Sequence, residues 1–496
     1  MTAEDGNNPV GDITRRSNRG MMWIGIASST VGLLDLVAFV ILVSFWISQE
    51  EVGVAAGAIT LFPVLDLVTD LGLTSAVIQR DDHTPGRIST IFWLNVMLSL
   101  AVSLVLALVI GPLLAWWQGH AIIAWMLAAY GAKLVWQNVY FIPYALMKRE
   151  LRFKELSVLR IIANLAEFSG KVGFAWAGFG VWCFVLGPFC RVLVTGIGTQ
   201  ILHPWRPKLV LNFRDAVDWT SYGMKTSASK ILFHLYTKAD SQVVLRFFGD
   251  AASGLYYAAY NMVLQPALVI SEIVTNVAFP VFSRLKHDRK ALIEQLLSFT
   301  RMNMVIMFLF IGVVVVSTDD MLRIFSMGGQ DDYTSAAPAA RILCLVALLR
   351  ALSFVIPPLL DGMNKPMLTL RYMIIASIVM PLLFLLSAAV LGPWLDYVSV
   401  AVGWAVGYPI AFVALLYMAT RVLELPTSEL VHRVIGIPLC AAGATALSFG
   451  AALALDPLPP AVRFAGATVV FLVAYGVLLA RYQGISVRSV LRSLKS

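Results

Sequence analysis

The sequence is poor in charged residues. Only 13% of its 496 residues are Asp, Glu, Lys or Arg, whereas 59% are hydrophobic, and the mean hydropathy is +0.80. A soluble protein of this length has roughly a quarter charged residues, so the composition excludes an ordinary soluble domain. Cysteine is scarce as well. The four cysteines lie in apolar segments without CxxC spacing, so we expect neither disulfides nor a metal site, but small core residues: Cys183, Cys190, Cys344 and Cys440.

Two further absences narrow the function. No Gly-x-x-x-x-Gly-Lys-Ser/Thr run occurs, so we expect no direct ATP hydrolysis by this chain. A membrane enzyme usually needs a sizeable outer loop with catalytic residues, and the longest outer connection expected here is residues 317–334. It contains four aspartates and is interpreted as a solvated acidic loop.

What the sequence does have is a series of apolar runs of about 20 residues, each long enough to cross a bilayer as a helix. They predict an all-α polytopic membrane protein with about 14 transmembrane helices. The predicted spans are residues 22–46, 53–78, 88–115, 121–146, 156–178, 181–202, 219–248, 252–282, 294–316, 335–360, 367–391, 397–420, 434–455 and 461–480.

Basic residues lie mainly in alternate connections between these spans; Arg323 is the one clear exception, and Arg463 lies near an outer helix end. The connections 49–52, 116–120, 178–180, 249–251 and 392–396 contain no Lys or Arg, whereas each of the intervening connections contains at least one. By the positive-inside rule, the basic side and both termini are cytoplasmic. The net charge of +8 then follows from membrane topology, and no nucleic-acid partner is needed.

A weak internal repeat suggests two halves of the chain with the same orientation in the membrane. Residues 51–81 and 253–285 each start near a Gly outside the membrane, cross once and end at a polar-Arg pair. We therefore expect two six-helix bundles followed by two C-terminal helices. The predicted domains are a cytoplasmic tail (1–21), an N-terminal lobe (22–215), a C-terminal lobe (216–421) and two extra helices with a cytoplasmic tail (422–496). Parallel repeats place substrate between the halves.

Several stretches resemble bacterial polysaccharide translocases. DLGL at 70–73 with AVIQR at 76–80 is similar to the end of their second helix, and PYALMKRELRF at 143–153 to their fourth-to-fifth helix connection. GLYYAAYN at 254–261 with FPVF at 279–282 is similar to their eighth helix. The resemblance runs from about Arg19 to Arg421. It departs from the family pattern at GMNK, residues 362–365, where many relatives place an Arg directly after the Gly.

This family belongs to the multidrug/oligosaccharidyl-lipid/polysaccharide (MOP) exporter superfamily, so the resemblance implies a MATE-like fold. It also implies a flippase of the bacterial inner membrane. Such a protein moves undecaprenyl-pyrophosphate-linked oligosaccharide from the cytoplasmic to the outer leaflet, by alternating access, for exopolysaccharide, capsule or O-antigen synthesis. The implied partners are the lipid-linked sugar, the bilayer and possible polymerase and export machinery. No cofactor is expected, but coupling to an H⁺ or Na⁺ gradient is possible.

A cationic stripe in the seventh span fits an anionic substrate. Lys230, His234 and Lys238 are spaced i,i+4, so on a helix they fall within an arc of roughly 80°. Placing a cationic side chain near the bilayer centre costs roughly a few kcal/mol or more of free energy. Such side chains therefore usually line a cavity or pair with an acid. For His234 alone, a hydrogen-bonded interior histidine is the alternative. The stripe predicts contacts with a pyrophosphate through charge-assisted hydrogen bonds.

Other deep cations have two open interpretations. Arg350 lies near the middle of its span and is predicted to bind substrate. For Lys133 and Arg191, cavity lining and pairing between helices remain equally open. Lys171 follows Glu167 at i,i+4, which is typical of a structural ion pair.

Acidic residues within the spans are candidates for ion coupling. Asp66 and Asp70 are i,i+4 on one face, and two close carboxylates in a low dielectric favour a raised pKa for one of them. Glu272 is a third candidate. The alternative is that each acid neutralises a Lys or Arg on a neighbouring helix.

Two other function classes compete with the flippase. A cation-coupled multidrug antiporter of the same superfamily would favour acids and aromatics in its cavity over several deep cations. A membrane glycosyltransferase or polymerase would need the sizeable outer loop discussed above. The sequence therefore predicts a transporter and not an enzyme.

Overall fold

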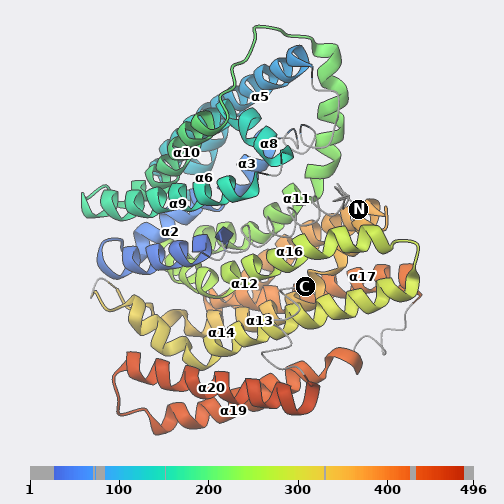
Figure 1. The fold of residues 1–496 in the computed structure, drawn as a ribbon. Helices are drawn as coiled ribbons and strands as arrows, with labels where there is room; N and C mark the ends of the chain where they lie inside the picture. Colours follow the sequence, from blue (N-terminus) through green and yellow to red (C-terminus); the bar gives the residue numbers. More distant parts are fainter. Residues whose placement is uncertain are drawn as a thin grey trace, which may run out of the picture. The chain divides into compact units, whose positions relative to one another are not determined.

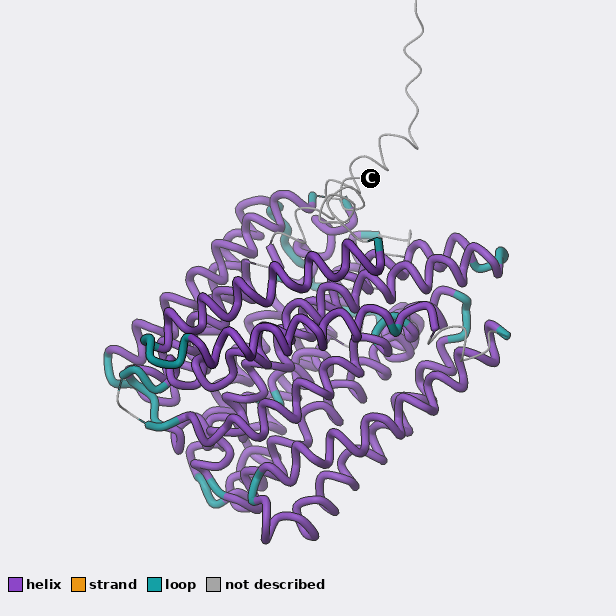
Figure 2. Tube along the Cα trace, turned by 90° about the horizontal axis from the view of Figure 1, so that it is seen from below, coloured by secondary structure: helices purple, strands orange, loops and turns teal. Residues whose placement is uncertain are grey.

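The computed structural model describes residues 27–28, 30–70, 73, 77, 84–150, 152–328, 331–424 and 432–484, without the side chains of 213–227, 276, 460 and 461. Throughout this part of the chain the regular structure is helical, and no strand occurs in it (Figure 2). The predicted tail 1–21, most of the motif at 70–80 and the last twelve residues lie outside the described part. The all-α prediction is confirmed.

The chain divides into two compact units. Unit 1 comprises residues 1–38 and 61–231, and unit 2 comprises residues 39–60 and 232–496. The boundary passes through α11 (Phe213–Phe248), whose last described turns belong to unit 2. The predicted lobe boundaries at 215/216 and 421/422 stay predictions.

Most helices of unit 1 are labelled in Figure 1. The unit contains α3 (Phe62–Asp70), α5 (Pro85–Val105), the π-helical turn η1 (Leu106–Ile110), α6 (Gly111–Gln118), α7 (Ala121–Val139), α8 (Phe141–Arg149), α9 (Phe153–Trp176), the short 3₁₀ turn η2 (Gly180–Trp182) and α10 (Cys183–Leu202).

Local sequence explains several helix boundaries in unit 1. Pro85 begins α5, where its missing N–H costs nothing. Gly119 ends α6 in the left-handed conformation, with φ 83°. The predicted span 121–146 is not one helix, because Tyr140 (φ −107°, ψ 7°) separates α7 from α8. This break turns the residues on either side of Tyr140 toward one pocket, described below.

Unit 2 contains most of the long helices. They are α2 (Gln49–Ile59), α12 (Asp250–Leu285), α13 (Arg289–Phe325), the 3₁₀ turn η3 (Tyr333–Ala336), α14 (Ala337–Ser353), α15 (Ile356–Gly362), α16 (Pro366–Leu395), α17 (Val398–Leu423), α19 (Gly436–Ala454) and α20 (Pro460–Gln483). The last two form a helical hairpin, drawn in red in Figure 1.

The predicted outer loop 317–334 is wrong in its extent. Helix α13 continues to Phe325 through a kink at Ser317 (φ −111°, ψ 15°), so most of the segment is helical. Its aspartates have partners. Asp319 pairs with Arg341, Asp320 with Arg463, and Asp331 accepts a hydrogen bond from the backbone N–H of Gln49. The fourth, Asp332, accepts from Thr334, and these hydrogen bonds lower the pKa of the Asp332 carboxyl.

Ten helices in the described part are long and apolar enough to span a membrane, and Thr30–Phe45 is a shorter apolar helix. The ten correspond to all predicted spans except the first, fourth, fifth and seventh. Helices α7, α9 and α11 occupy the last three of these positions. The count of 14 stays a prediction, whereas the polytopic membrane class is confirmed.

Candidate functional site

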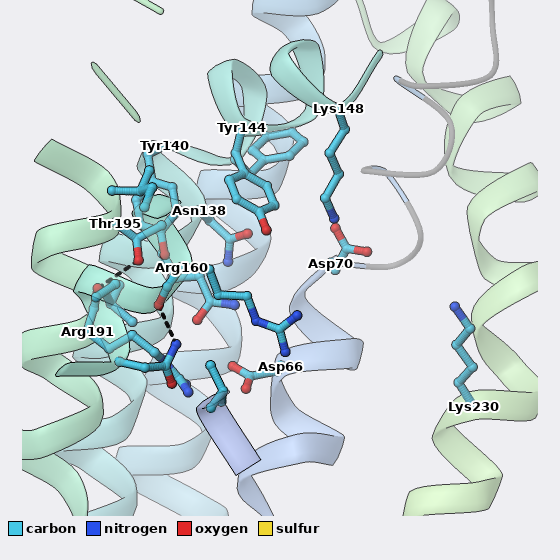
Figure 3. Close-up of a pocket in the computed structure, with 17 residues that line it drawn as sticks. Asp66, Asp70, Asn138, Tyr140, Tyr144, Lys148, Arg160, Arg191, Thr195 and Lys230 are labelled. Atoms are coloured by element: carbon cyan, nitrogen blue, oxygen red, sulfur yellow. Dashed lines mark hydrogen bonds between the residues drawn. The ribbon is translucent and has the colours of Figure 1, made fainter. Parts of the chain in front are cut away.

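A polar pocket of about 470 Å³ lies within unit 1 (Figure 3). Its lining comes from the Thr30–Phe45 helix, from α3, from both sides of the break at Tyr140, from α9 and α10, and from the middle of α11. Pockets of roughly 300–1,000 Å³ are typical of small-molecule sites. In a chain this apolar, a polar pocket indicates a site for a polar ligand.

Four basic side chains line the pocket: Lys148, Arg160, Arg191 and Lys230. They come from α8, α9, α10 and α11. Lys230 lies on the opposite side from Arg191 in Figure 3. The Lys148 ammonium lies 4.7 Å from the centroid of the Tyr144 ring, and Arg160 donates to the Ser28 hydroxyl at 3.0 Å. Basic groups from four helices therefore share one cavity.

The two acids of the pocket are Asp66 and Asp70, one turn apart on α3, as their spacing predicts. The Asp66 carboxylate is held in place by two residues that lie behind the pocket lining. Lys133 Nζ lies 2.8 Å from its Oδ1, and the Tyr130 hydroxyl donates to its Oδ2 at 2.9 Å. Lys133 is fully buried and does not line the pocket. Of its two interpretations, the structure favours pairing between helices.

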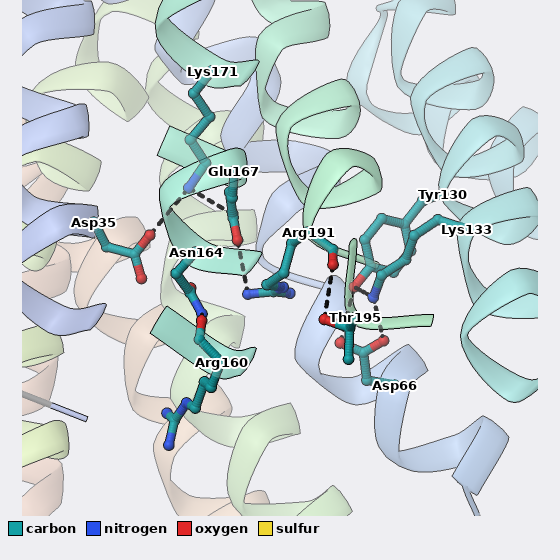
Figure 4. A network of polar contacts seen from close by, with 10 residues as sticks. All are labelled: Asp35, Asp66, Tyr130, Lys133, Arg160, Asn164, Glu167, Lys171, Arg191 and Thr195. Carbon is teal, nitrogen blue, oxygen red and sulfur yellow. Dashed lines mark hydrogen bonds and ion pairs between the residues drawn. The ribbon is translucent and has the colours of Figure 1, made fainter. Parts of the chain in front are cut away.

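A second ion-pair network joins α9, α10 and the helix Thr30–Phe45, which carries Asp35 (Figure 4). Glu167 contacts Lys171 at 2.8 Å, as the i,i+4 spacing predicts, and Arg191 at 2.9 Å. Lys171 also contacts Asp35 at 3.2 Å. Gly187 makes room for the lysine, since a Cβ there would lie 2.4 Å from Lys171 Cγ. Arg191 thus fulfils both of its predicted interpretations: it is paired and it lines the pocket.

The pocket keeps a positive charge after these pairs are counted. Asp66 is balanced by Lys133, and Arg191 by Glu167. The remaining lining charges are three basic groups (Lys148, Arg160, Lys230) and one acid, Asp70, so three minus one leaves a formal charge of +2. Positive charge inside a membrane protein is expensive unless it serves a ligand or a path. The pocket is therefore suited to an anion.

Neutral hydrogen-bonding groups complete the lining. They include side-chain amides and hydroxyls on both sides of the break at Tyr140 and on α9 and α10: Gln137, Asn138, Tyr140, Tyr144, Asn164 and Thr195. Some are fixed by the protein, since Asn95 donates to the Asn138 oxygen at 2.6 Å and Asn164 donates to the Arg160 carbonyl at 2.7 Å. Such groups can pair with the hydroxyls of a ligand as well as with its charge.

The predicted cationic stripe is divided between the units. Lys230 is exposed and lines the unit 1 pocket, whereas His234 and Lys238 belong to unit 2. The Lys238 ammonium lies 4.3 Å from the centroid of the Tyr260 ring, a cation–π contact. His234 is half-buried beside Phe233, with 5.3 Å between ring centroids. The spacing alone does not bring the three residues into one described pocket.

Arg350 occupies a different setting, in the core of unit 2. It is 1% exposed, and none of its guanidinium nitrogen atoms has a hydrogen-bond partner among the described residues. Four aromatic rings surround it, with centroids 5.0–6.0 Å from its Cζ: Phe233, Phe354, Trp404 and Tyr408. Trp404 also donates to the buried Asp240 carboxylate at 2.7 Å. The arginine is stabilised by ring faces, and it does not line the unit 1 pocket.

Glu272, the third ion-coupling candidate, is exposed on α12 and does not line the pocket. Two basic pocket residues, Arg160 and Lys148, were missed by the sequence reasoning. Arg160 lies inside the predicted span 156–178, so an unbalanced charge at membrane depth was an available signal. Lys148 gave no such signal, because it is placed in a basic cytoplasmic connection.

Fold and composition together define a polytopic, all-helical membrane protein with a cationic pocket. The model of the polysaccharide biosynthesis protein family matches residues 43–327, more than half of the chain. The chain belongs to this family, which confirms the resemblance seen in its motifs.

Curated relatives are similar over most of their length. The teichuronic acid biosynthesis protein TuaB of Bacillus subtilis is 26% identical over 344 residues, covering 68% of this chain and 70% of the relative. The lipopolysaccharide biosynthesis protein WzxC of Escherichia coli is 26% identical over 346 residues, covering 67% of each. The succinoglycan biosynthesis transport protein ExoT of Rhizobium meliloti is 26% identical over 300 residues, covering 60% of each.

Solved structures share the fold. The lipid II flippase MurJ in an inward closed conformation is similar with a TM-score of 0.73 over 92% of this chain and 98% of MurJ, at 14% identity. An inward-facing MATE multidrug transporter of the MOP superfamily is similar with a TM-score of 0.61 over 81% of this chain and 99% of the transporter, also at 14% identity. The MOP/MATE-like fold prediction is confirmed.

Proposed function

We propose that this protein is a flippase for lipid-linked oligosaccharide, which it moves from the cytoplasmic to the outer leaflet for the synthesis of a surface polysaccharide. The observation that carries this proposal is the unit 1 pocket, which has a formal charge of +2 once Lys133 and Glu167, the partners of Asp66 and Arg191, are counted. Family membership and the names of the relatives support it. The protein acts as a transporter in this proposal and catalyses no covalent step.

The chemistry of the substrate explains the lining. The pyrophosphate of a lipid-linked sugar must leave water before it crosses about 30 Å of hydrocarbon. Arg160 and Arg191 can each offer a planar fork to phosphate oxygens, whereas Lys148 and Lys230 offer point charges that release a ligand readily. The amide and hydroxyl groups nearby suit the first sugar. The lipid tail remains in the bilayer.

Arg191 and Lys230 are retained from the predicted substrate contacts, and Arg160 and Lys148 are added. Lys133 does not contact substrate in this proposal, because it lies behind the pocket lining and pairs with Asp66. His234, Lys238 and Arg350 lie in unit 2, and their roles as substrate contacts stay predictions. Their positions in unit 2 follow from the division of α11 and from the aromatic core around Arg350.

Coupling to an H⁺ or Na⁺ gradient is part of the proposal, and Asp70 is its candidate carrier. It lines the pocket one turn from Asp66 on α3. The positive-inside pattern supports an inner-membrane location with cytoplasmic termini. A polymerase and export machinery are the expected partners, because the flipped unit needs assembly into polymer.

A multidrug antiporter is the second candidate, since MATE transporters share the fold. The pocket charge argues against it. A pocket with a formal charge of +2 would repel a cationic drug. Asp66 and Asp70 would suit that role only if Lys133 left Asp66 unpaired, and Lys133 lies 2.8 Å from it.

The test removes pocket charge while keeping polar side chains. Arg160→Gln combined with Lys230→Gln should reduce polymer export by tenfold or more, on the order expected from losing two charge-assisted contacts. Lipid-linked intermediate should accumulate in the cytoplasmic leaflet. The matched control is Arg246→Gln, an exposed cation on the same helix as Lys230 that does not line the pocket. Normal export by the double variant at normal membrane levels would refute the pocket as the substrate site.

A further inference from the structure

Lys133 lies directly behind the pocket wall. Its side chain is fully buried, so no ligand in the pocket touches it. Yet its ammonium contacts Asp66, which lines the pocket and whose side chain is 31% exposed. The buried ammonium of Lys133 is therefore directly paired with the Asp66 carboxylate, which a ligand in the pocket can contact.

The contacts fix both oxygens of Asp66. Lys133 Nζ lies 2.8 Å from Oδ1, and the Tyr130 hydroxyl donates to Oδ2 at 2.9 Å. Lys133 also donates to the Tyr130 oxygen at 3.0 Å and lies 4.5 Å from the centroid of its ring. The Tyr130 ring stacks on Phe62 of α3, with centroids 3.5 Å apart and an interplanar angle of 11°. The aromatic pair thus ties the helix that carries Asp66 to the helix that carries Lys133.

Removing the lysine would change what a ligand experiences. Asp66 would face the pocket as an uncompensated carboxylate, and the formal charge of the pocket would fall from +2 to +1. In a site of low dielectric, one unit charge within about 10 Å of a multiply charged anion changes its binding by well over a kcal/mol. The effect is repulsive for pyrophosphate and attractive for a cation.

We propose that Lys133 is a positioning residue that sets the anion selectivity of the pocket by neutralising and orienting Asp66. This inference rests on the proposed function, because it assumes that the pocket receives a phosphate-bearing substrate. It differs from a direct contact, which the burial of Lys133 excludes. It differs from a purely structural role in one respect. Removing Asp66 together with Lys133 should restore anion binding.

The experiment measures binding of inorganic pyrophosphate to the full-length protein in nanodiscs, by isothermal titration calorimetry at low salt. Lys133→Met should weaken binding about tenfold. Lys133→Met with Asp66→Asn should bind within about twofold of the unsubstituted protein, because the pair is replaced by two neutral groups. Neutral replacement of a buried pair is often tolerated by a fold, so the double variant is informative even if the single one is unstable.

The matched control is another ion pair, Arg341 with Asp319, which is about half exposed and lies in unit 2. Arg341→Met should leave pyrophosphate binding unchanged. A double variant at Lys133 and Asp66 that folds but binds tenfold more weakly would overturn the inference while leaving the anion pocket intact. If the unsubstituted protein fails to bind pyrophosphate, the anionic-substrate proposal itself is refuted, and this inference falls with it.

Discussion

Gly53 of α2 and Gly254 of α12 make reciprocal contacts with each other's helix. A Cβ atom at Gly53 would lie 1.9 Å from the carbonyl oxygen of Asp250, four residues before Gly254. A Cβ atom at Gly254 would lie 2.0 Å from the carbonyl oxygen of Gln49, four residues before Gly53. The equivalent positions of the two glycines reflect the internal repeat between residues 51–81 and 253–285. The two repeated segments cross at their matching glycines within unit 2.

Gly53→Ala and Gly254→Ala should each lower the thermal stability of the purified protein. The obstructing atoms belong to the backbone, so no side-chain rotation relieves the clash, and overpacking of this kind costs about 1–3 kcal/mol or more. Gly476→Ala is the control, because a Cβ there meets no atom within 4 Å. Alanine in that helix should be neutral or slightly stabilising. Equal melting temperatures for all three variants would contradict the close crossing.

Much of the fold was predictable because the bilayer imposes a simple pattern. Apolar length and the distribution of basic residues located the helices, and the ten spanning helices lie at predicted positions. The interruptions were harder to predict. The break at Tyr140 has a local cause, because Pro143 has no N–H to donate to the carbonyl four residues earlier, at Val139. The kink at Ser317 has no proline nearby, so tertiary packing, which a single sequence does not reveal, determines it.

The site was predictable where partners lie on one helix. The Glu167–Lys171 pair follows from i,i+4 spacing, and so does the common face of Asp66 and Asp70. The Lys133–Asp66 pair joins residues 67 positions apart on different helices, so its existence depends on how α3 packs against α7. For the same reason, the stripe on α11 predicted a common surface but not the division of its members between two units.

Trp404→Phe should destabilise unit 2 and also weaken the cation–π contacts that stabilise the buried Arg350. The indole N–H donates to Asp240 at 2.7 Å, and its ring lies 5.0 Å from the Arg350 guanidinium carbon. Losing a hydrogen bond to a buried charged group costs about 1–3 kcal/mol, and phenylalanine supplies a weaker cation–π partner. The measurement is thermal unfolding in detergent. Trp394→Phe, at a site 79% exposed, should leave the melting temperature almost unchanged.

Asp331→Asn should loosen the start of α2. The Asp331 carboxylate accepts the backbone N–H of Gln49, the first residue of the helix, at 2.6 Å, while Ser48 and Glu51 form a capping box beside it. An anion at a helix N-terminus stabilises it by about 0.3–1 kcal/mol, and the neutral amide forfeits part of this. Hydrogen exchange in residues 49–53 should become faster. Asp319→Asn, in an exposed pair with Arg341, should leave that exchange rate unaltered.

Arg463→Gln should be among the most destabilising single charge removals in unit 2, because its partner is buried. Arg463 Nε donates to both oxygens of Asp320, at 2.8 and 3.0 Å, and Asp320 is only 4% exposed. Breaking a buried pair by removing one member costs about 3–5 kcal/mol, since it strands the other charge. Arg341→Gln breaks an exposed pair and should cost at most about 1 kcal/mol. Combining Arg463→Gln with Asp320→Asn should recover much of the lost melting temperature. If the double variant melts no higher than Arg463→Gln alone, the loss arises from packing of the arginine stem between α13 and α20 and not from the stranded carboxylate.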